Sequence, residues 1–448
     1  MNKKSKFTIS TTHLILLSFL VTVLLGAVLL MLPISSATGQ KTPFVDALFT
    51  ATTATCVTGL VVVPTATAWS VFGHIVILIL IQLGGLGVIT VLAGIALTLN
   101  RKMGIGRSVL LQDAFNLDTL FGLKAFVKKV IIGTFIVEGV GALGYMTVFV
   151  PQFGAKGIWI SVFNSISAFC NAGIDIIGEN SLMDYATNPA INGITSLLII
   201  LGGLGYIVWW DLLRILRQRK KLKHLTLHSK IVLWATAILI FGGAALIAVF
   251  EWNNPLTIGN MSIFDKIQVS LFQSITTRTA GFASVAQENL TNPSSLVSLL
   301  LMFIGGSPVG TAGGIKTVTF VVLFATAFVV VRQKNEVNMF GRSIARQAVS
   351  KAVGVCCMSF GILFLSTLLL SAVTDASMLD VLFETVSATA TVGLSRNLTS
   401  SLNTWGKLII TATMYLGRVG PISLMIAFNL RKRRPSIITN PVETISVG

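Results

Sequence analysis

The chain has 448 residues, of which 53% are hydrophobic and 11% are charged, and its mean hydropathy is +0.84. Such a composition suits a protein whose surface faces lipid and excludes an ordinary water-soluble globular protein. The formal net charge is +17. The basic residues fall in separate loops between apolar segments, which favours membrane topology over nucleic-acid binding as the cause of this charge.

A hydrocarbon core of about 30 Å needs roughly 20 apolar residues per helical span, and segments of that length recur along the chain. The first apolar run, 14–32, is too long for a secretory signal, so we count it as a span. We therefore predict an all-α membrane protein with eight transmembrane helices. In chain order the predicted spans are 14–33, 71–99, 125–150, 190–213, 230–250, 295–330, 347–373 and 404–430.

Lysine and arginine collect in alternate loops. Of the 33 basic residues, 25 precede the first span, follow the last, or lie in every second loop or within the first five residues of the span that follows it. Short basic loops stay on the cytoplasmic side, so we predict that both termini are cytoplasmic and that the protein is a multi-pass protein of the plasma membrane. Most acidic residues fall on the opposite side, where they would concentrate cations. The basic face could also bind anionic membrane lipid or an acidic cytosolic partner.

A short polar stretch that ends in glycine recurs four times, at intervals of 114, 108 and 112 residues. Each copy lies between two predicted spans and follows an amphipathic stretch long enough for a half-membrane helix, at 44–54, 158–168, 264–276 and 378–388. We therefore predict four tandem helix–pore loop–helix repeats arranged pseudo-fourfold around one central pore. The predicted repeats are 1–100 (pore loop 43–60), 101–222 (pore loop 158–174), 223–335 (pore loop 262–282) and 336–448 (pore loop 377–394).

The loop sequences predict a selectivity filter. A half-helix that ends at the loop directs its negative dipole end inward, which favours a cation there. We expect the following residues to run extended with their carbonyl groups toward the axis, and the closing glycine to supply the positive φ that this geometry needs. One such loop alone would be an ordinary turn, but four in register favour a filter. The predicted filter residues are Thr55, Cys56, Val57, Thr58, Gly59, Phe169, Cys170, Asn171, Ala172, Gly173, Thr277, Arg278, Thr279, Ala280, Gly281, Thr389, Ala390, Thr391, Val392 and Gly393.

The third loop is one residue shorter between its half-helix phenylalanine and its glycine, and it carries Arg278. We therefore expect the fourfold symmetry to be only approximate.

A glycine cluster follows each loop glycine by 24 to 29 residues, in the last span of each repeat. For the first two copies we expect close helix packing. In the third copy a proline and five glycines cannot continue a regular helix, so we predict an interruption at 305–314 that faces the permeation path and acts as a gate. The predicted gate residues are Gly305, Gly306, Ser307, Pro308, Gly310, Thr311, Ala312, Gly313, Gly314, Lys316 and Arg418.

Arg418 replaces a glycine in the fourth cluster and places a cation inside the membrane, where charge is costly and usually functional. We expect it to face the pore, although pairing with a helix end or a group of carbonyls is the alternative.

A secondary transporter and an enzyme are the two alternatives to a channel. A sodium- or proton-coupled secondary transporter would also use repeats and broken helices, and Glu138 lies in the middle of the third span. This carboxyl group could carry protons or could be a buried hydrogen-bonded acid. Transporter repeats are commonly twofold and inverted, whereas four loops of one orientation favour a channel.

An enzyme is disfavoured, because no nucleophile with a neighbouring base can be proposed. His224 and His228 have the i, i+4 spacing of metal ligands on a helix, but lysines surround them. The four cysteines, two of them adjacent, are expected to be packing residues rather than a disulfide framework.

The four loops, the glycine-rich inner helices, the interruption at 305–314 and Arg418 together resemble the Trk/Ktr/HKT superfamily of cation-translocating subunits, most closely its bacterial KtrB type. The resemblance implies potassium uptake through a channel-like pore, with one glycine per loop in the filter and potassium at the filter carbonyls, in the plasma membrane of a bacterium. It also implies a homodimer with one pore per protomer, a separate cytosolic nucleotide-binding ring of the KtrA type on the basic face, and stimulation by sodium. No organic cofactor is expected. Members that prefer sodium carry serine in the first loop, so Gly59 favours potassium.

Overall fold

The computed structural model describes residues 11–88, 90, 91, 123–333 and 336–420, and over these ranges it is predominantly helical. The helices are α1 (Thr11–Leu30), α2 (Phe44–Cys56), α3 (Thr65–Ala68), α4 (Val71–Leu86), α7 (Leu123–Phe153), α8 (Ala155–Cys170), α9 (Pro189–Leu204), α10 (Tyr206–Arg217), α11 (Leu227–Glu251), α12 (Ile263–Thr276), α13 (Asn292–Phe303), α14 (Thr317–Val331), α15 (Arg346–Ser371), α16 (Met378–Ala390) and α17 (Thr404–Val419).

Five short 3-10 helices and one antiparallel hairpin complete the described part of the chain. The 3-10 helices are η1 (Pro33–Ser35), η2 (Met183–Tyr185), η3 (Leu222–His224), η4 (Gln287–Asn289) and η5 (Thr399–Ser401), and the hairpin pairs β1 (Asn338–Met339) with β2 (Arg342–Ser343).

Four helices of the described residues, α1, α7, α11 and α15, are each apolar and long enough to cross a membrane. They confirm the predicted spans 14–33, 125–150, 230–250 and 347–373. Much of the surface of these helices is apolar and exposed, as lipid-facing helices require.

The helix after each polar loop is interrupted. The span predicted over 190–213 is divided into α9 and α10, which meet at 97°, so it is not one straight helix. The cause is Gly205, whose φ of +85° lies outside the helical region. The predicted break in span 295–330 is confirmed, because α13 ends at Phe303 and α14 begins at Thr317.

We call the helices that follow the polar loops, α4, α9, α13 and α17, the inner helices. The other two, α4 and α17, stop at the same place in the repeat. α4 ends just before Gly87 (φ +82°) and α17 just before Gly420 (φ +85°). The remainders of the predicted spans 71–99 and 404–430, at residues 89, 92–99 and 421–430, lie outside the described residues.

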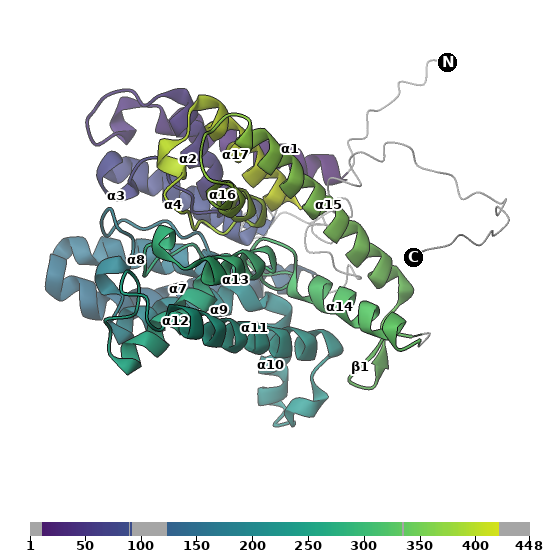
Figure 1. The fold of residues 1–448 in the computed structure, drawn as a ribbon. Coiled ribbons are helices and arrows are strands. Elements are labelled where there is room, and N and C mark those ends of the chain that lie inside the picture. The colour runs from purple at the N-terminus through teal and green to yellow at the C-terminus, as the bar shows by residue number, and fades with distance from the viewer. Residues whose placement is uncertain (1–10, 89, 92–122, 334–335, 421–448) are drawn as a thin grey trace, which may run out of the picture.

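The inner helices pack in a closed cycle. Besides packing within its own repeat, α4 contacts α8, α9 contacts α12, α13 contacts α16, and α17 contacts α2. Figure 1 shows the last of these contacts, in which the purple N-terminal helices lie beside the yellow-green α16 and α17. Each inner helix therefore supports the short helix of the next unit, and the last supports the first.

Each stretch predicted to be a half-helix does form a short helix, namely α2, α8, α12 and α16. Local sequence explains where two of them begin, since Ser262 and Ser377 cap α12 and α16 by accepting hydrogen bonds from the backbone N–H groups of Asp265 and Asp380. A phenylalanine of each half-helix, nine or ten residues before the loop glycine, is almost completely buried and packs the helix into the core. These residues are Phe49, Phe163, Phe272 and Phe383.

Candidate ion pathway

Three of the four polar loops share one backbone geometry. α2, α8 and α16 each end in a left-handed residue: Val57 (φ +55°), Asn171 (φ +59°) and Thr391 (φ +51°). In the shorter third loop the positive φ falls on Thr279 (+66°). Left-handed backbone at a non-glycine residue costs energy and persists only where the surroundings hold it. Only Asn171, a residue type that adopts this conformation readily, could have been predicted from its residue type.

Extended backbone was predicted for the residues of each polar loop, but the first residues of each predicted filter loop are still helical. Thr55 and Cys56 belong to the last turn of α2, and the equivalent pairs belong to α8 and α16. Thr277 of the third loop is helical in its φ and ψ as well. In loops one, two and four, only the last three residues leave the helix, because the helical hydrogen bonding continues two residues further than the polar sequence suggested.

A hydroxyl side chain near the end of three of the four half-helices holds the loop, a feature that sequence reasoning missed. Thr53 Oγ1 accepts from the backbone N–H of Gly59 (2.9 Å), Ser387 Oγ accepts from Gly393 (3.0 Å), and Ser167 Oγ accepts from Ile174 (3.1 Å). In a trans peptide the C=O points away from the N–H. Fixing the N–H groups on the half-helix side therefore directs the neighbouring carbonyl groups to the opposite side. The detectable signal was a threonine or serine six residues before each of these three glycines.

The structure brings the four glycines together. Their φ values are +96°, +65°, +84° and +101°, so the predicted positive φ is confirmed at all four. A Cβ atom built on any one of them would lie within 2.5 Å of a carbonyl oxygen from the next loop. These contacts run around a closed ring: Gly59 to Ala172, Gly173 to Ala280, Gly281 to Val392, and Gly393 to Thr58.

A polar cavity of about 360 Å³ opens above this ring. All four glycines lie in its wall together with the acidic residues Asp175, Glu179 and Glu288. Two other carboxyl groups assigned to the outer side, Glu251 and Glu384, do not line it and are buried in hydrogen-bond networks. The cavity is therefore suited to hydrated cations, with fewer acidic groups than the sequence suggested.

Glycines of the inner helices pack against the innermost residue of a polar loop. A Cβ on Gly84 would collide with the carbonyl of Thr55, and one on Gly202 with that of Phe169. This confirms the close packing predicted for the first two clusters. Gly417 makes the same contact with Thr389 in the fourth unit.

The segment between α13 and α14 lies directly beneath the loops. Thr311 Oγ1 donates to the carbonyl of Phe169 (3.1 Å), and the backbone N–H of Thr311 donates to Gly202 (3.2 Å). A Cβ on Gly313 would lie 2.7 Å from the carbonyl of Ala390. The segment thus touches loops two and four at their inner ends and is in a position to obstruct a path between them.

Three cations hold this segment from different sides. Arg418 donates to the carbonyls of Thr311 and Gly84, each at 2.6 Å, so it joins the segment to α4. Lys316 donates to Ala312 within the segment (2.6 Å), and Arg278 of the third loop donates to Gly305 (3.4 Å). Arg418 therefore pairs with carbonyls, which was the alternative prediction, and one of those carbonyls belongs to the predicted gate.

Glu138 lies behind the second loop rather than on the ring. Its side chain is 4% exposed, and it accepts hydrogen bonds from the Gln82 amide (3.2 Å) and the Cys170 thiol (3.8 Å). Ser165 donates to its backbone carbonyl (2.6 Å). This arrangement matches the buried hydrogen-bonded acid of the two roles considered above.

We expect Glu138→Gln to retain cation flux with an unchanged pH profile, because glutamine keeps the shape and one acceptor oxygen. Glu138→Leu should lower thermal stability, because it leaves the buried amide of Gln82 without its acceptor at a cost of about 1–3 kcal/mol. Flux into vesicles between acidic and alkaline pH, with thermal unfolding of each variant, measures both effects. A pH dependence that disappears in Glu138→Gln would instead identify a proton carrier.

Two smaller predictions have clear outcomes. All four cysteines are free thiols, and the predicted packing role fits the buried Cys56 and Cys170 but not the exposed Cys357. His224 and His228 are not on one helix, because His224 ends η3 and His228 lies in the first turn of α11. The i, i+4 helical spacing was therefore wrong.

Comparison with known proteins gives consistent results. The profile of a family described as "TrkH: Cation transport protein" matches residues 2–437. A Bacillus subtilis protein, "Ktr system potassium uptake protein B", is 40% identical over 92% of this chain and 91% of its own length. The "Potassium/sodium uptake protein NtpJ" of Enterococcus hirae is 36% identical over 100% of this chain and 99% of its own length. The crystal structure of the potassium transporter TrkH from Vibrio parahaemolyticus has the same fold, with a TM-score of 0.76 at 17% identity, over 96% of this chain and 87% of that one.

Proposed function

Since the chain belongs to the TrkH family of cation transport proteins, we propose that it is a membrane subunit for potassium uptake, with a channel-like pore through the plasma membrane. Its apolar helices agree with a multi-pass membrane protein. We further propose that both termini are cytoplasmic, from the distribution of basic residues.

The ring of four glycines is the observation that carries this proposal. We propose four repeats with the boundaries given above, around one pore, and the twenty predicted filter residues as its walls. Potassium would lose its water shell to the carbonyl groups of the four loops, chiefly those of the residues just before the glycines. The half-helices would add their negative dipole ends, which favour a cation in the centre. Potassium enters this account as the transported ion.

We propose that segment 305–314 with Lys316 and Arg418 is the gate. The support is its position against Phe169 and Ala390 and the hydrogen bonds from Arg418. Movement of the segment away from the loops would open a path toward the cytoplasmic side.

A sodium-permeable or sodium-coupled transporter is the second candidate. The name of the Enterococcus hirae relative includes sodium as well as potassium, which is the observation in its favour. The first loop carries Gly59 where sodium-preferring members of the family carry serine, so all four loops have glycine, and this favours potassium.

Two relatives are named as parts of a "Ktr system", which supports a regulatory partner. We propose a homodimer that binds a KtrA-like nucleotide-binding ring through the basic loops 214–230 and 332–351. Gating by the ring and stimulation by sodium are parts of this proposal.

Flux into proteoliposomes tests the function. We expect the purified protein to take up rubidium, and we expect external potassium to compete with rubidium far better than sodium does. A co-expressed cytosolic partner should change the rate but leave the order of the ions unaltered. Vesicles without protein are the control. No uptake with or without the partner would refute the proposal, and equal competition by both ions would favour the sodium-permeable alternative.

A further inference from the structure

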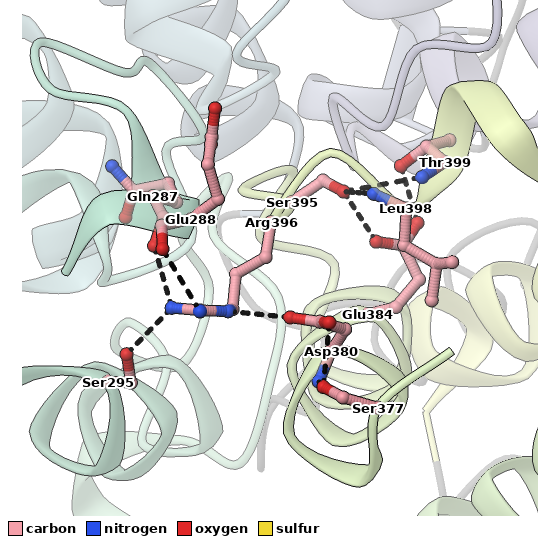
Figure 2. Close-up of polar contacts among 10 residues, drawn as sticks. All are labelled: Gln287, Glu288, Ser295, Ser377, Asp380, Glu384, Ser395, Arg396, Leu398 and Thr399. Carbon is pink, nitrogen blue, oxygen red and sulfur yellow. Dashed lines mark hydrogen bonds and ion pairs between the residues drawn. The ribbon is translucent and has the colours of Figure 1, made fainter. Parts of the chain in front are cut away.

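Arg396 lies three residues after Gly393 and joins two parts of the chain at the outer mouth. Figure 2 shows its guanidinium between Asp380 on one side and the segment that contains Gln287 and Glu288 on the other. Nε donates to Asp380 (2.8 Å), and Nη1 donates to the carbonyl of Gln287 (2.8 Å) and to Ser295 Oγ (3.0 Å). Nη2 donates to the carbonyl of Glu288 (3.1 Å). The planar fork of arginine can serve four acceptors in this way, and a lysine ammonium cannot.

The ion pair with Asp380 is charged at neutral pH. Burial alone would raise the pKa of Asp380, but the hydrogen bonds from Ser377 and Arg396 outweigh it and hold the pKa below its usual value. The side chain of Asp380 is 29% exposed, and that of Arg396 is 12% exposed. The positive charge of Arg396 is therefore compensated locally, and repulsion of incoming cations is small.

The repeat unit itself does not require an arginine here. The equivalent residues, each three positions after its loop glycine, are Val62, Ile176 and Ser284. None of these can make the contacts of a guanidinium. Arg396 therefore belongs to the junction between the third and fourth units rather than to the common fold of the loops.

Arg396 completes a continuous hydrogen-bonded path between two half-helices. On the third unit, the side chain of Gln287 accepts from the amide of Gln273 on α12 (2.6 Å), and both residues are buried. On the fourth, Ser395 donates to the fully buried Glu384 of α16 (2.6 Å), as does Thr399. The segment after Gly393 is thus fixed to its own half-helix through Glu384 and to the neighbouring unit through Arg396 (Figure 2).

We infer that Arg396 is a positioning residue for ion selectivity, which sets the distance between the third and fourth filter strands by fastening the segment after Gly393 to Gln287, Glu288 and Ser295. The inference rests on the proposed potassium filter. Ions of one charge and different radius are distinguished by the spacing and rigidity of the surrounding carbonyls. A junction that holds two of the four strands together therefore acts on selectivity without contacting the ion.

The test compares Arg396→Gln with the wild type in proteoliposomes by rubidium uptake against potassium and sodium competition. We expect the potassium-to-sodium ratio to fall about tenfold, the equivalent of one lost charge-assisted hydrogen bond, while rubidium uptake itself continues. Arg396→Lys should be intermediate, because lysine can pair with Asp380 but cannot reach all four acceptors.

Lys407→Gln is the matched control. It removes the Lys407–Asp46 ion pair (2.6 Å), which has similar exposure and joins the fourth unit to the first half-helix. Asp46 is at the outer start of α2, away from the glycine ring. We expect Lys407→Gln to lower thermal stability with the selectivity ratio unchanged.

An unchanged potassium-to-sodium ratio in folded Arg396→Gln overturns the inference. An equal fall of this ratio in Lys407→Gln also overturns it, because the effect would then come from a general loss of rigidity. If Arg396→Gln does not fold, Arg396→Lys and Asp380→Asn carry the test, and unchanged ratios in both overturn it. A wild type without selective uptake refutes the proposed function instead. A selective wild type with a selective Arg396→Gln refutes only the role of Arg396.

Discussion

Replacing Gly59 with serine is expected to remove most of the discrimination between potassium and sodium. Gly59 has a φ of +96°, and a Cβ there would lie 2.5 Å from the carbonyl oxygen of Ala172 and 3.2 Å from Gly393 Cα. A real Cβ cannot approach a carbonyl oxygen so closely, so the Ala172 carbonyl must turn or the two loops must separate. Either change distorts the ring of carbonyl groups that, in the proposed filter, would replace the water shell of the ion.

The expected loss is about a hundredfold in the potassium-to-sodium ratio, or roughly 3 kcal/mol, the upper end of the strain that one unfavourable backbone conformation stores. Competition of both ions with rubidium uptake measures it. Gly39→Ser is the matched control, because Gly39 also has a positive φ (+70°) but has no atom within 4 Å of its Cβ position. An unaltered preference in folded Gly59→Ser would count against the filter, and an equal loss in Gly39→Ser would count against the steric explanation.

Deleting residues 309–312 is expected to raise the rate of uptake by about tenfold or more. The deletion removes Thr311, which accounts for the contact with Phe169 and for one of the two hydrogen bonds of Arg418. A hydrogen bond from a charged group contributes about 1.5–3 kcal/mol, so its loss alone shifts the balance between a seated and a displaced segment by tenfold or more.

Initial rubidium uptake rates, normalised to the amount of folded protein, measure this effect. The potassium-to-sodium ratio should be preserved, because the deletion leaves the glycine ring in place. Arg418→Gln is the companion variant and should raise the rate less, since the segment keeps its own hydrogen bonds to Gly202 and Gly203. A rate that is unchanged or lower in folded deletion protein would show that the segment is not a gate.

The parts of the fold that sequence predicted are those that local chemistry determines. The break between α13 and α14 followed from a proline and five glycines within ten residues, whose combined cost is too large for a continuous helix. The half-helices followed from short amphipathic stretches, and the positive φ of Gly59 and its equivalents followed from the special freedom of glycine.

What sequence could not predict depends on packing. The 97° bend at Gly205 was not foreseen, because an isolated glycine in an apolar stretch is compatible with a continuous helix. Val57 adopts a left-handed conformation against its own preference, in a turn where its backbone N–H donates to Ala54 and Thr53 Oγ1 accepts from Gly59. Arg396 was assigned to the outer side, but its partners in the third unit are about a hundred residues away in sequence.

The closed cycle of helix contacts has a consequence for biosynthesis. The ion pair between Asp46 and Lys407 joins residues 361 positions apart, and Gly59 touches Gly393 in the ring. The first half-helix therefore has no neighbour on one side until almost the whole chain has left the ribosome. If the proposed pore is correct, a polypeptide released early lacks one of its walls, so a truncated product would not form a potassium-specific leak in the host membrane.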